Sequence, residues 1–542
     1  MSAAARPSRP GPYAATAACS LLASMAMDCG EASPTAGTYI SIPDTIVASP
    51  DQRSKVERGL FFASENRRDP RSRLIAVHFL RFPALHGEKG RPPVFLLDGG
   101  PGDDSDFTNP QAYYSPSLVE RLRRTRDVVY VSQRGNPKAR GLVPALYWKL
   151  PGHPMNLPGS AALRREGNRV AVKAVMQEWS DRRVDLRGYD ILNIVDDVHE
   201  LRAALGYDRI VLRGCSFGSQ WSLSYLKRWP ETVDRALLSG VEPLDYAYDS
   251  PKWLWSSLSR LAGRAEADAV LAKDIPEGGL MSAFRAVIER LEHRAQTVTI
   301  RAPDTGAAVP VTVGADDVRA LIARLVSGKT IREGLGNWPR FILEMYRGDF
   351  RFVAAKAWEA RRAEGSGVPL IFLLIDNSLG ISAGRDSRLI AEPEARWLGD
   401  VNAIYHDTRD LTPTPDAGDA FRADWPIEVP VLLVNGDLDW STPIENARHL
   451  RGFLKHGHLV EVRDGTHCGE LTTMAQERPE QLEQINSFID ADFDRTTPER
   501  FFAKLPRTVA YAPLRFAPLS GTTLYDEWLQ QSANRVMKRM NP

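Results

Sequence analysis

The chain has 542 residues, of which 43% are hydrophobic and 25% are charged, so it can bury a large core and lacks the composition of a disordered protein. Its formal net charge is +1 and it has no long lysine or arginine run, which excludes a protein built mainly to bind nucleic acid. At this length we expect one α/β core that carries an insertion.

Residues 1–36 differ in composition from the rest of the chain. Arg6 and Arg9 precede an uncharged stretch, 13–27, that is rich in alanine, leucine and methionine. This order resembles a secretory signal, which predicts a secreted or periplasmic protein. If the leader is not a signal, the protein is cytoplasmic.

The end of the leader leaves two modes of export open. Residues 24–26 (Ser-Met-Ala) place small side chains where a signal peptidase needs them. Cys29 offers the alternative of a lipid anchor, although Asp28 stands where a small residue is preferred. The sequence has no other segment that is long and apolar enough to span a bilayer, so we expect no stable membrane span.

A glycine-rich loop follows the first apolar run of the core. Residues 93–97 (Pro-Val-Phe-Leu-Leu) are typical of a buried strand, and residues 98–102 (Asp-Gly-Gly-Pro-Gly) follow it. Glycines let a backbone approach a substrate closely. We expect the amide of Gly99 to be one donor of an oxyanion hole, and the alternative is a structural turn.

The most informative motif is Gly-Cys-Ser-Phe-Gly at 214–218. It lies between an apolar strand, 209–212, and a helical pattern, and another helical pattern at 189–205 precedes it. This order is typical of a nucleophile elbow, in which the central serine is exposed on a sharp strand-to-helix turn. Ser216 is therefore the candidate nucleophile, and the amide of Phe217 is the second candidate oxyanion donor.

The four cysteines show no disulfide framework and no metal signature. Cys19 and Cys29 lie in the leader, and Cys215 and Cys468 each adjoin a candidate catalytic residue. We interpret Cys215 as a packing residue rather than a thiol nucleophile, because the elbow exposes the serine after it. We expect the mature chain to have little or no disulfide bonding.

The candidate acid follows a late strand. Residues 429–436 form an apolar, β-branched run, and the loop 437–443 begins beyond its end. A serine hydroxyl needs a histidine to take its proton and an acid to orient that histidine. Asp439 is the preferred acid. Asp437 is the competitor, and its position beside the strand end suits a role in shaping the turn.

The candidate base is His467. It lies in a glycine-flanked loop, 463–469, after the strand-like run 459–462, and the interval from Asp439 leaves room for one helix and one strand. The fold requires that spacing between the two loops. Three other histidines lie in the intervening helix or its exit and are interpreted as structural: His449, His456 and His458.

The stretch between Ser216 and Asp439 is far longer than the sheet needs, which predicts a helical lid over 246–424. Helical patterns occur at 253–271, 280–294, 316–326 and 337–358, and a hairpin is expected from 297–301 and 309–313. Lids over such sites select substrates and exclude water. Aromatic side chains in the lid could line a pocket, although such spacing is more often core: Trp253, Trp255, Trp338, Phe341 and Tyr346.

The chain therefore divides into five predicted parts. They are a leader (1–36), a first core part (37–245), the lid (246–424), a second core part (425–499) and a C-terminal extension (500–542) that ends in a helix-like pattern at 524–540. Whether the extension packs on the core is left open.

Together these motifs resemble the prolyl iminopeptidase and tripeptidyl aminopeptidase family of serine peptidases. The matching segments are the glycine loop at 98–102, Gln-Arg-Gly at 133–135, the elbow at 214–219, 229–243, 436–439 and 465–469. The chain departs from the family at Asp98, where the iminopeptidases have histidine, and at Ser132, which replaces the usual acid. Cysteines common around the lid of the secreted tripeptidyl branch are missing.

This resemblance implies an α/β-hydrolase fold, with a mostly parallel doubly wound sheet and a large helical lid inserted between nucleophile and acid. It implies that Ser216, His467 and Asp439 act as a triad, with oxyanion donors at Gly99 and Phe217. The implied function is an aminopeptidase that releases N-terminal residues from short peptides without a cofactor. A carboxylesterase on small or lipid esters is the alternative, and a degenerate hydrolase that only binds a ligand is a third.

Such aminopeptidases hold the free ammonium of the substrate with a carboxylate of the lid, because a desolvated ion pair discriminates strongly. The candidates in this chain are Glu344, Asp349 and Glu359, none of which is singled out by its context. The oligomeric state is left open.

Overall fold

The computed structural model describes residues 34–49, 52–87, 91–102, 114–135, 147–149, 153–326, 331–362, 367–471, 473–519 and 521–540. Most of the predicted leader, including Cys19 and Cys29, lies outside these residues. Among the helices in these ranges, none combines the length and apolar character needed to cross a membrane.

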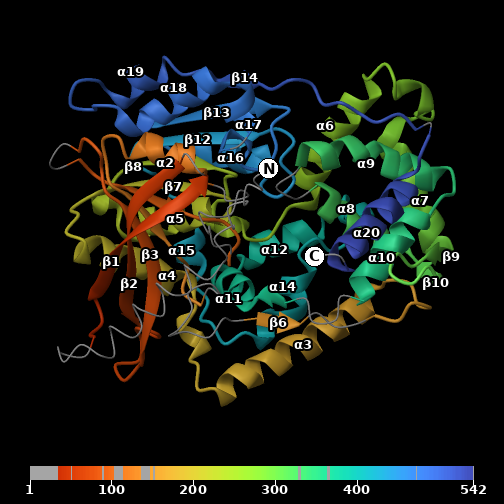
Figure 1. Ribbon diagram of the computed structural model, residues 1–542, viewed down its shortest axis with the longest axis horizontal. Coiled ribbons are helices and arrows are strands. Elements are labelled where there is room, and N and C mark those ends of the chain that lie inside the picture. The colour runs from red at the N-terminus through yellow and green to blue at the C-terminus, as the bar shows by residue number, and fades with distance from the viewer. Residues whose placement is uncertain are drawn as a thin grey trace, which may run out of the picture.

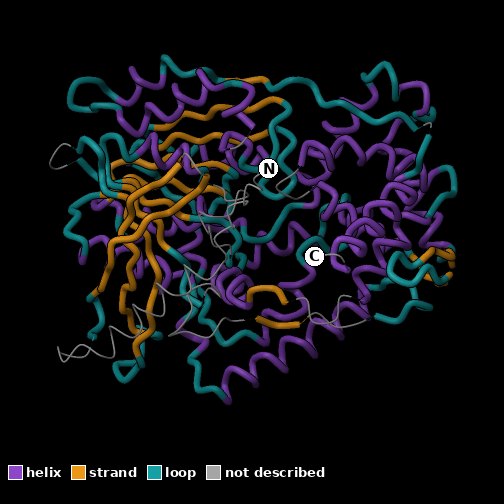
Figure 2. Tube along the Cα trace, in the orientation of Figure 1, coloured by secondary structure: helices purple, strands orange, loops and turns teal. Residues whose placement is uncertain are grey.

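A ten-stranded sheet forms the core, and Figure 2 shows its strands gathered on one side of the molecule. Their order is β1 (Tyr39–Ser49), β2 (Gln52–Ser64), β3 (Leu74–Phe82), β5 (Val128–Val131), β4 (Val94–Leu97), β7 (Ile210–Cys215), β8 (Val233–Ser239), β12 (Val431–Gly436), β13 (Gly457–Arg463) and β14 (Thr508–Ala510). The pairs from β1 to β5 are antiparallel and those from β5 to β14 are parallel.

The central strands are apolar because both faces of the sheet are covered. Every residue of β4, β5, β7 and β12 is buried, which is typical of parallel strands between two helical layers. One layer contains α4 (Ile191–Ala204), α5 (Phe217–Arg228) and α16 (Ile444–Arg451). The other contains α2 (Pro116–Leu122), α17 (Thr473–Glu477), α18 (Pro479–Asp490) and α19 (Pro498–Phe502). The sheet confirms the predicted fold class.

The chain between β8 and β12 is mainly helical and lies beside the sheet (Figure 1). Its helices are α6 (Pro251–Glu266), α7 (Gly279–His293), α8 (Ala315–Val326), α9 (Ile331–Tyr346), α10 (Arg351–Arg362), α11 (Leu370–Leu379), α12 (Ala383–Ile390), α13 (Ala395–Leu398), α14 (Ala403–Thr408) and α15 (Asp419–Arg422). The predicted hairpin forms from β9 (Gln296–Arg301) and β10 (Ala308–Val313). We keep the name lid for this region.

The lid has its own apolar core, which explains how it stays ordered without entering the sheet. Trp338 and Phe341 are buried there, so these two aromatic side chains belong to the core and do not line a pocket. The same cluster includes Leu438 and Trp440, which flank Asp439. The lid therefore packs directly on the loop that carries the candidate acid.

One predicted helix is two helices. The pattern at 337–358 is divided between α9 and α10, and Gly348 between them has a left-handed φ of +97°. Apolar spacing continues across the break because both helices face the same core, so periodicity alone could not reveal the turn.

Another element lies against the lid although it belongs to the first half of the chain. Helix α3 (Ala161–Asp181) contacts α14, and Arg165 and Asn168 donate hydrogen bonds to the buried carboxylate of Asp407 at 3.0 and 3.1 Å. A two-stranded pairing of β6 (Tyr147–Lys149) with β11 (Gly367–Pro369) lies next to them. The lid thus receives support from residues well before the elbow.

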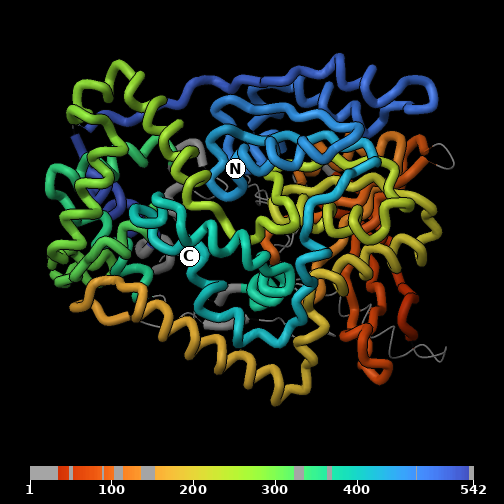
Figure 3. The backbone as a smooth tube through the Cα atoms, turned by 180° about the vertical axis from the view of Figure 1, so that it is seen from behind, coloured from red at the N-terminus to blue at the C-terminus, as the bar shows by residue number. Residues whose placement is uncertain are grey.

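The C-terminal extension joins the two regions. Strand β14 extends the sheet beside β13, and helix α20 (Leu524–Met540) packs on α10 of the lid. The indole nitrogen of Trp528 in α20 donates to Glu359 of α10 at 2.7 Å. Figure 3 shows the blue C-terminal segment passing along the top of the molecule from the sheet to the lid.

Candidate active site

Ser216 occupies the turn between β7 and α5. Its backbone has φ +60° and ψ −132°, a conformation that a residue with a side chain adopts only under strain. Its amide donates to the carbonyl of Ser239 at 3.0 Å, which ties the turn to the neighbouring strand β8. The residue therefore has the backbone that a nucleophile elbow requires.

The two glycines of the motif are fixed by steric contact. A β-carbon at Gly214 would lie 2.1 Å from the carbonyl oxygen of Gly218, and one at Gly218 would lie 2.0 Å from that of Leu97 in β4. Helix α5 therefore packs so closely on strands β7 and β4 that no side chain fits at either position. This contact brings the elbow beside the glycine loop that follows β4.

Asp439 and His467 lie together at the carboxyl ends of β12 and β13. Nδ1 of His467 is 2.9 Å from Oδ2 and 3.1 Å from Oδ1 of Asp439, whose side chain is fully buried. A carboxylate in this position orients the imidazole ring and fixes its tautomer. The structure thus brings the predicted acid and base into contact.

Thr442 completes the environment of this carboxylate, and sequence reasoning missed it. Its hydroxyl donates to Oδ2 of Asp439 at 2.7 Å and lies 3.1 Å from Nδ1 of His467, while its amide donates to Oδ1 of Asp439 at 2.9 Å. A hydroxyl three residues after a loop aspartate is common in ordinary turns, so the spacing alone carried no signal of function.

Asp437, the competing acid, has a structural role. Its carboxylate accepts from the amide of Asp464 at 2.8 Å and from Arg264 of the lid at 2.8 Å. It therefore connects the acid loop to the start of the histidine loop and to α6. Burial raises the pKa of this carboxyl group.

The glycine loop after β4 is held by Gln133. The side-chain amide of Gln133 donates to the carbonyl of Gly99 at 2.8 Å and accepts from the amide of Gly102 at 2.7 Å. The amide of Gly99 donates to the carboxylate of Asp98 at 3.1 Å, an interaction that the motif did not predict. Phe217, the other predicted donor, begins helix α5 directly after Ser216.

The next residue of that Gln-Arg-Gly motif has a structural role. The guanidinium of Arg134 is buried and binds both carboxylate oxygens of Asp197 in α4, at 2.7 and 2.5 Å. It also donates to the backbone carbonyls of Glu65 and Gly188, each at 2.7 Å. In this motif, Gln133 therefore holds the glycine loop, and Arg134 binds helix α4 of the helical layer.

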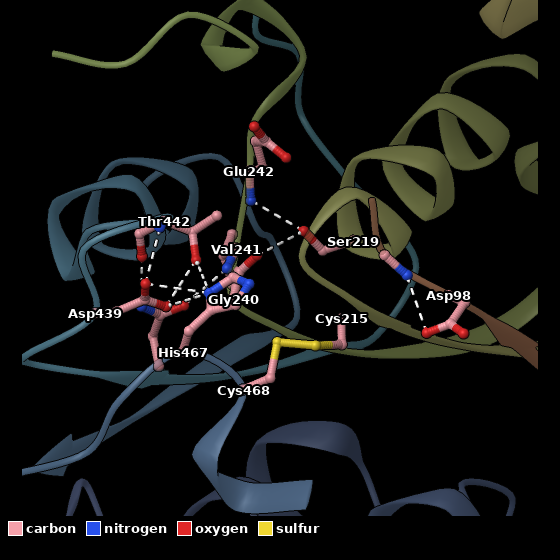
Figure 4. The surroundings of a disulfide bond; sticks show 12 residues. Asp98, Cys215, Ser219, Gly240, Val241, Glu242, Asp439, Thr442, His467 and Cys468 are labelled. Atoms are coloured by element: carbon pink, nitrogen blue, oxygen red, sulfur yellow. Dashed lines mark hydrogen bonds and ion pairs between the residues drawn. A yellow bond between two sulfur atoms is a disulfide. The ribbon is translucent and has the colours of Figure 1, made fainter. Parts of the chain in front are cut away.

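The prediction of little or no disulfide bonding in the mature chain is wrong. Cys215 and Cys468 form a disulfide, with their Cα atoms 6.1 Å apart (Figure 4). Cys215 is therefore half of a cross-link rather than a packing residue. A separation of 253 residues hides the pairing from the sequence, because only the folded sheet brings the two loops together.

Three further carboxyl groups gather near the acid and base. They are Glu242, which follows β8, Asp249, which lies just before α6, and Asp376 in α11. Burial raises the pKa of Asp249 to about 7 and that of Asp376 to about 8, and the pKa of Glu242 is also raised well above its usual range. Their mutual repulsion, and that of Asp439, adds to the effect on Glu242.

One guanidinium group partly offsets the rise in the pKa values of these carboxyl groups. Arg385 of α12 lowers the pKa of both Glu242 and Asp249, while its own guanidinium donates to the carbonyl of Tyr248 at 2.7 Å. Tyr405 donates its hydroxyl to Asp376 at 2.6 Å. With a pKa of about 7, Asp249 is partly ionised at neutral pH, and its carboxylate can then attract a further positive charge.

A cavity of about 920 Å³ lies between helix α3 and the helices of the lid. Asp249 and Trp440 line it, together with apolar side chains of the lid such as Leu254, Phe372 and Ile404. Trp440 directly follows Asp439, and the charge of His467 acts on Asp249. The cavity is therefore next to the candidate acid and base, and a carboxyl group faces into it.

The lid carboxylates proposed from the sequence have other partners. Glu344 accepts from the amide of Leu524 at 3.1 Å, Asp349 pairs with Arg351 at 2.6 Å, and Glu359 accepts from Trp528 at 2.7 Å. Their negative charges are used to attach the C-terminal extension and to stabilise a helix start. Glu242, Asp249 and Asp376 lie nearer the site, although they come from three separate segments.

Comparison with known proteins agrees with this geometry. Residues 92–275 match the family model for the alpha/beta hydrolase fold. The chain belongs to the α/β-hydrolase superfamily. A second family model, described as TAP-like protein, matches residues 407–477 of this α/β hydrolase, the region that contains Asp439 and His467.

Two curated relatives of this α/β hydrolase are the serine protease Hip1 of Mycobacterium tuberculosis and of Mycobacterium bovis. Each is 25% identical over 182 residues, which is 32% of this chain and 34% of the relative. The match thus spans about a third of the length of these relatives. It supports a serine hydrolase at the level of the superfamily.

Solved structures with a similar fold include a serine hydrolase from Cycloclasticus zankles, which is 13% identical in sequence. The match covers 84% of this chain and 100% of that chain, with a TM-score of 0.32. A second is Cfl2 from Burkholderia cenocepacia, which is 12% identical in sequence. That match covers 83% of this chain and 100% of Cfl2, with a TM-score of 0.34.

Proposed function

We propose that this protein is an exported serine aminopeptidase that releases N-terminal residues from short peptides through an acyl-enzyme. The observation that carries the proposal is the group of carboxyl groups beside the acid and base, with Asp249 in the cavity wall. A peptide N-terminus carries a positive charge at neutral pH, whereas a simple ester substrate carries none. When Asp249 is ionised, its carboxylate in the cavity wall therefore favours the peptide.

In the proposed mechanism, Ser216 attacks the carbonyl carbon of the peptide bond while His467 takes its proton. Asp439 holds the imidazole and stabilises its positive charge. The oxygen anion that develops is stabilised by the amides of Gly99 and Phe217. The Gly99 amide must then leave the Asp98 carboxylate, to which it donates in this structure.

His467 next donates its proton to the leaving amine, and water enters. His467 acts as base again, and the attack of water on the acyl-enzyme releases the N-terminal fragment and restores Ser216. The steps balance without any further reactant, so the proposed reaction requires no cofactor.

Binding of the substrate ammonium would occur at Asp249 and Glu242. The protein around the cavity lowers the local dielectric constant, so an ion pair formed there is stronger than one in solution. The carboxyl groups must be ionised to bind a cation, which favours pH values at or above the pKa of about 7 of Asp249. The cavity of about 920 Å³ has room for more than one residue on the N-terminal side of the cleaved bond.

Export is part of the proposal and rests on two observations. The leader has the order of charged and apolar residues of a secretory signal. The Cys215–Cys468 disulfide is of a kind that forms and persists in oxidising compartments. Cys29 would be the site of a lipid anchor if the export signal is of the lipoprotein type.

The test is a matched panel of substrates. Purified protein is assayed on aminoacyl and tripeptidyl arylamides, on the same arylamides with an acetylated N-terminus, and on short-chain esters. We expect turnover of the free-amine arylamides, loss of turnover on acetylation, and no activity in Ser216→Ala. Cleavage of esters without any cleavage of arylamides would replace the proposal with a carboxylesterase. Failure of a fluorophosphonate to label Ser216 would contradict the assignment of the nucleophile.

A further inference from the structure

The disulfide joins the two residues that adjoin the proposed nucleophile and base. Cys215 directly precedes Ser216, and Cys468 directly follows His467. Figure 4 shows the bridge beneath Gly240 and His467, between the strand of Cys215 and the loop of Cys468. A cross-link at these two positions acts on the relative placement of the reacting side chains more directly than a cross-link elsewhere could.

The sheet alone does not bring these loops together. Strands β8 and β12 lie between β7 and β13, so the ends of β7 and β13 are separated by three strand spacings, or about 14 Å. The Cα atoms of Cys215 and Cys468 are nevertheless only 6.1 Å apart. The loops must bend toward each other over the ends of two strands, and the disulfide is a direct covalent connection between them.

Both loops have strained backbones at this point. Ser216 has φ +60° and Cys468 has φ +50°, in the left-handed region that is unfavourable for residues with a side chain. Such a backbone is strained and persists only where its surroundings fix it. Cys468 is itself strained, and Cys215 directly precedes the strained Ser216. The disulfide therefore opposes relaxation of the backbone at both Cys468 and Ser216.

Gly240, between the two loops, leaves no room for adjustment. A β-carbon there would lie 2.8 Å from Sγ of Cys468, 3.0 Å from Cε1 of His467 and 3.1 Å from the amide nitrogen of Ser216. Cys215 is fully buried and Cys468 is 3% exposed. The sulfur atom of Cys468 therefore packs against Gly240, which also adjoins His467 and the amide of Ser216.

We propose that the Cys215–Cys468 disulfide positions Ser216 relative to His467 and thereby sets the rate of acylation. The inference rests on the proposed function, because it assigns those two residues to the reaction. The substrate cavity and its carboxyl groups lie on other segments, so loss of the bridge would reduce kcat and leave KM nearly unchanged. A bond that only stabilised the fold would instead change thermal stability without changing the rate of the folded protein.

The test compares the wild type with the double variant Cys215→Ala, Cys468→Ala, at a temperature where circular dichroism shows both to be folded. We expect the rate of fluorophosphonate labelling at Ser216 and kcat for an arylamide to fall by about 10-fold to 100-fold, with KM changed by less than about threefold. Equal labelling rates in the two proteins would overturn the inference. Absence of labelling in the wild type would instead overturn the proposed function.

Reduction of the wild type provides the second arm if the double variant does not fold. A water-soluble phosphine and one water convert the disulfide to two thiols and a phosphine oxide, and thiol titration shows when two new thiols have appeared. Labelling should then slow by the same factor and recover on reoxidation with diamide. An unchanged rate in fully reduced, folded protein would overturn the inference. The double variant, where it folds, is the control for other effects of the phosphine.

Discussion

Thr442 donates its hydroxyl hydrogen to Oδ2 of Asp439 at 2.7 Å. The same carboxylate faces Nδ1 of His467 at 2.9 Å and is fully buried. Hydrogen bonds to a buried carboxylate satisfy its oxygen atoms and fix its direction. The threonine therefore supports the acid that would orient the base.

Thr442→Val keeps the shape of the side chain and removes this donor. We expect kcat to fall by about tenfold or more, because a hydrogen bond to a charged group contributes about 1.5–3 kcal/mol. Thr442→Ser retains the hydroxyl and is the control, with kcat near that of the wild type. Arylamide kinetics measure both, and full activity in Thr442→Val would exclude this role.

Asp439→Asn and Asp437→Asn form a matched pair two residues apart. We expect Asp439→Asn to lower kcat by about 10⁴-fold. In a serine protease triad the same substitution leaves the histidine in the wrong tautomer and has an effect of this size. Asp437→Asn should retain kcat within about tenfold and lower thermal stability, because it disturbs the contacts with Asp464 and Arg264. The reverse order of activities would make Asp437 the acid.

Asp249→Asn tests the binding of the substrate ammonium. We expect KM for a free-amine arylamide to rise by about tenfold or more, since loss of a desolvated ion-pair partner exceeds 1.4 kcal/mol. KM for a short-chain ester should not change. Asp349→Asn, in a lid carboxylate that pairs with Arg351, is the control. A similar rise of KM in both variants would show a general disturbance of the lid.

The pH dependence gives a separate check on Asp249. In the wild type, the ratio of kcat/KM for the arylamide to kcat/KM for the ester should rise as pH increases through about 7, because the carboxyl group becomes ionised. Taking the ratio removes the titration of the base, which both reactions share. In Asp249→Asn the rise should be reduced, and an unchanged profile would assign it to another group.

Asp376 predicts a pH dependence of stability with an unusual sign. Its pKa is raised from 3.8 to about 8 on folding, so the folded protein binds more protons than the unfolded chain between these values. Stability from this group is therefore full below pH 4 and is lost as pH rises toward 8. Asp376→Asn should raise the unfolding temperature more at pH 8 than at pH 5. A constant difference between the two pH values would contradict the raised pKa.

The sequence predicted the parts of the site that local geometry determines. An elbow needs two glycines around a serine because α5 packs on β7 and β4, and that requirement is written in consecutive residues. Strand, loop and residue order likewise indicated Asp439 and His467. The structure places both beside each other, and their roles in catalysis stay predictions.

What the sequence could not show depends on contacts between distant segments. Glu242, Asp249 and Asp376 come from a strand end, a loop and a lid helix, and nothing in their local patterns distinguishes them from surface acids. The disulfide was missed for the same reason, since Cys215 was interpreted locally as a packing residue and its partner Cys468 lies 253 residues away. The antiparallel strands β1, β2 and β3 were not assigned. Burial alternates over residues 53–56 of β2, whereas every residue of β3 after Leu74 is at least partly buried.

The last helix has a consequence for how the protein is made. Leu524, Tyr525 and Trp528 of α20 belong to the apolar core of the lid, and β14 is the last strand of the sheet. A chain grows from its N-terminus, and domains generally fold in that order. The core of the lid is therefore complete only once α20 has been made and has packed on α10. The lid helices between β8 and β12 must wait for this segment, which is separated from them in the sequence by the last three strands of the sheet.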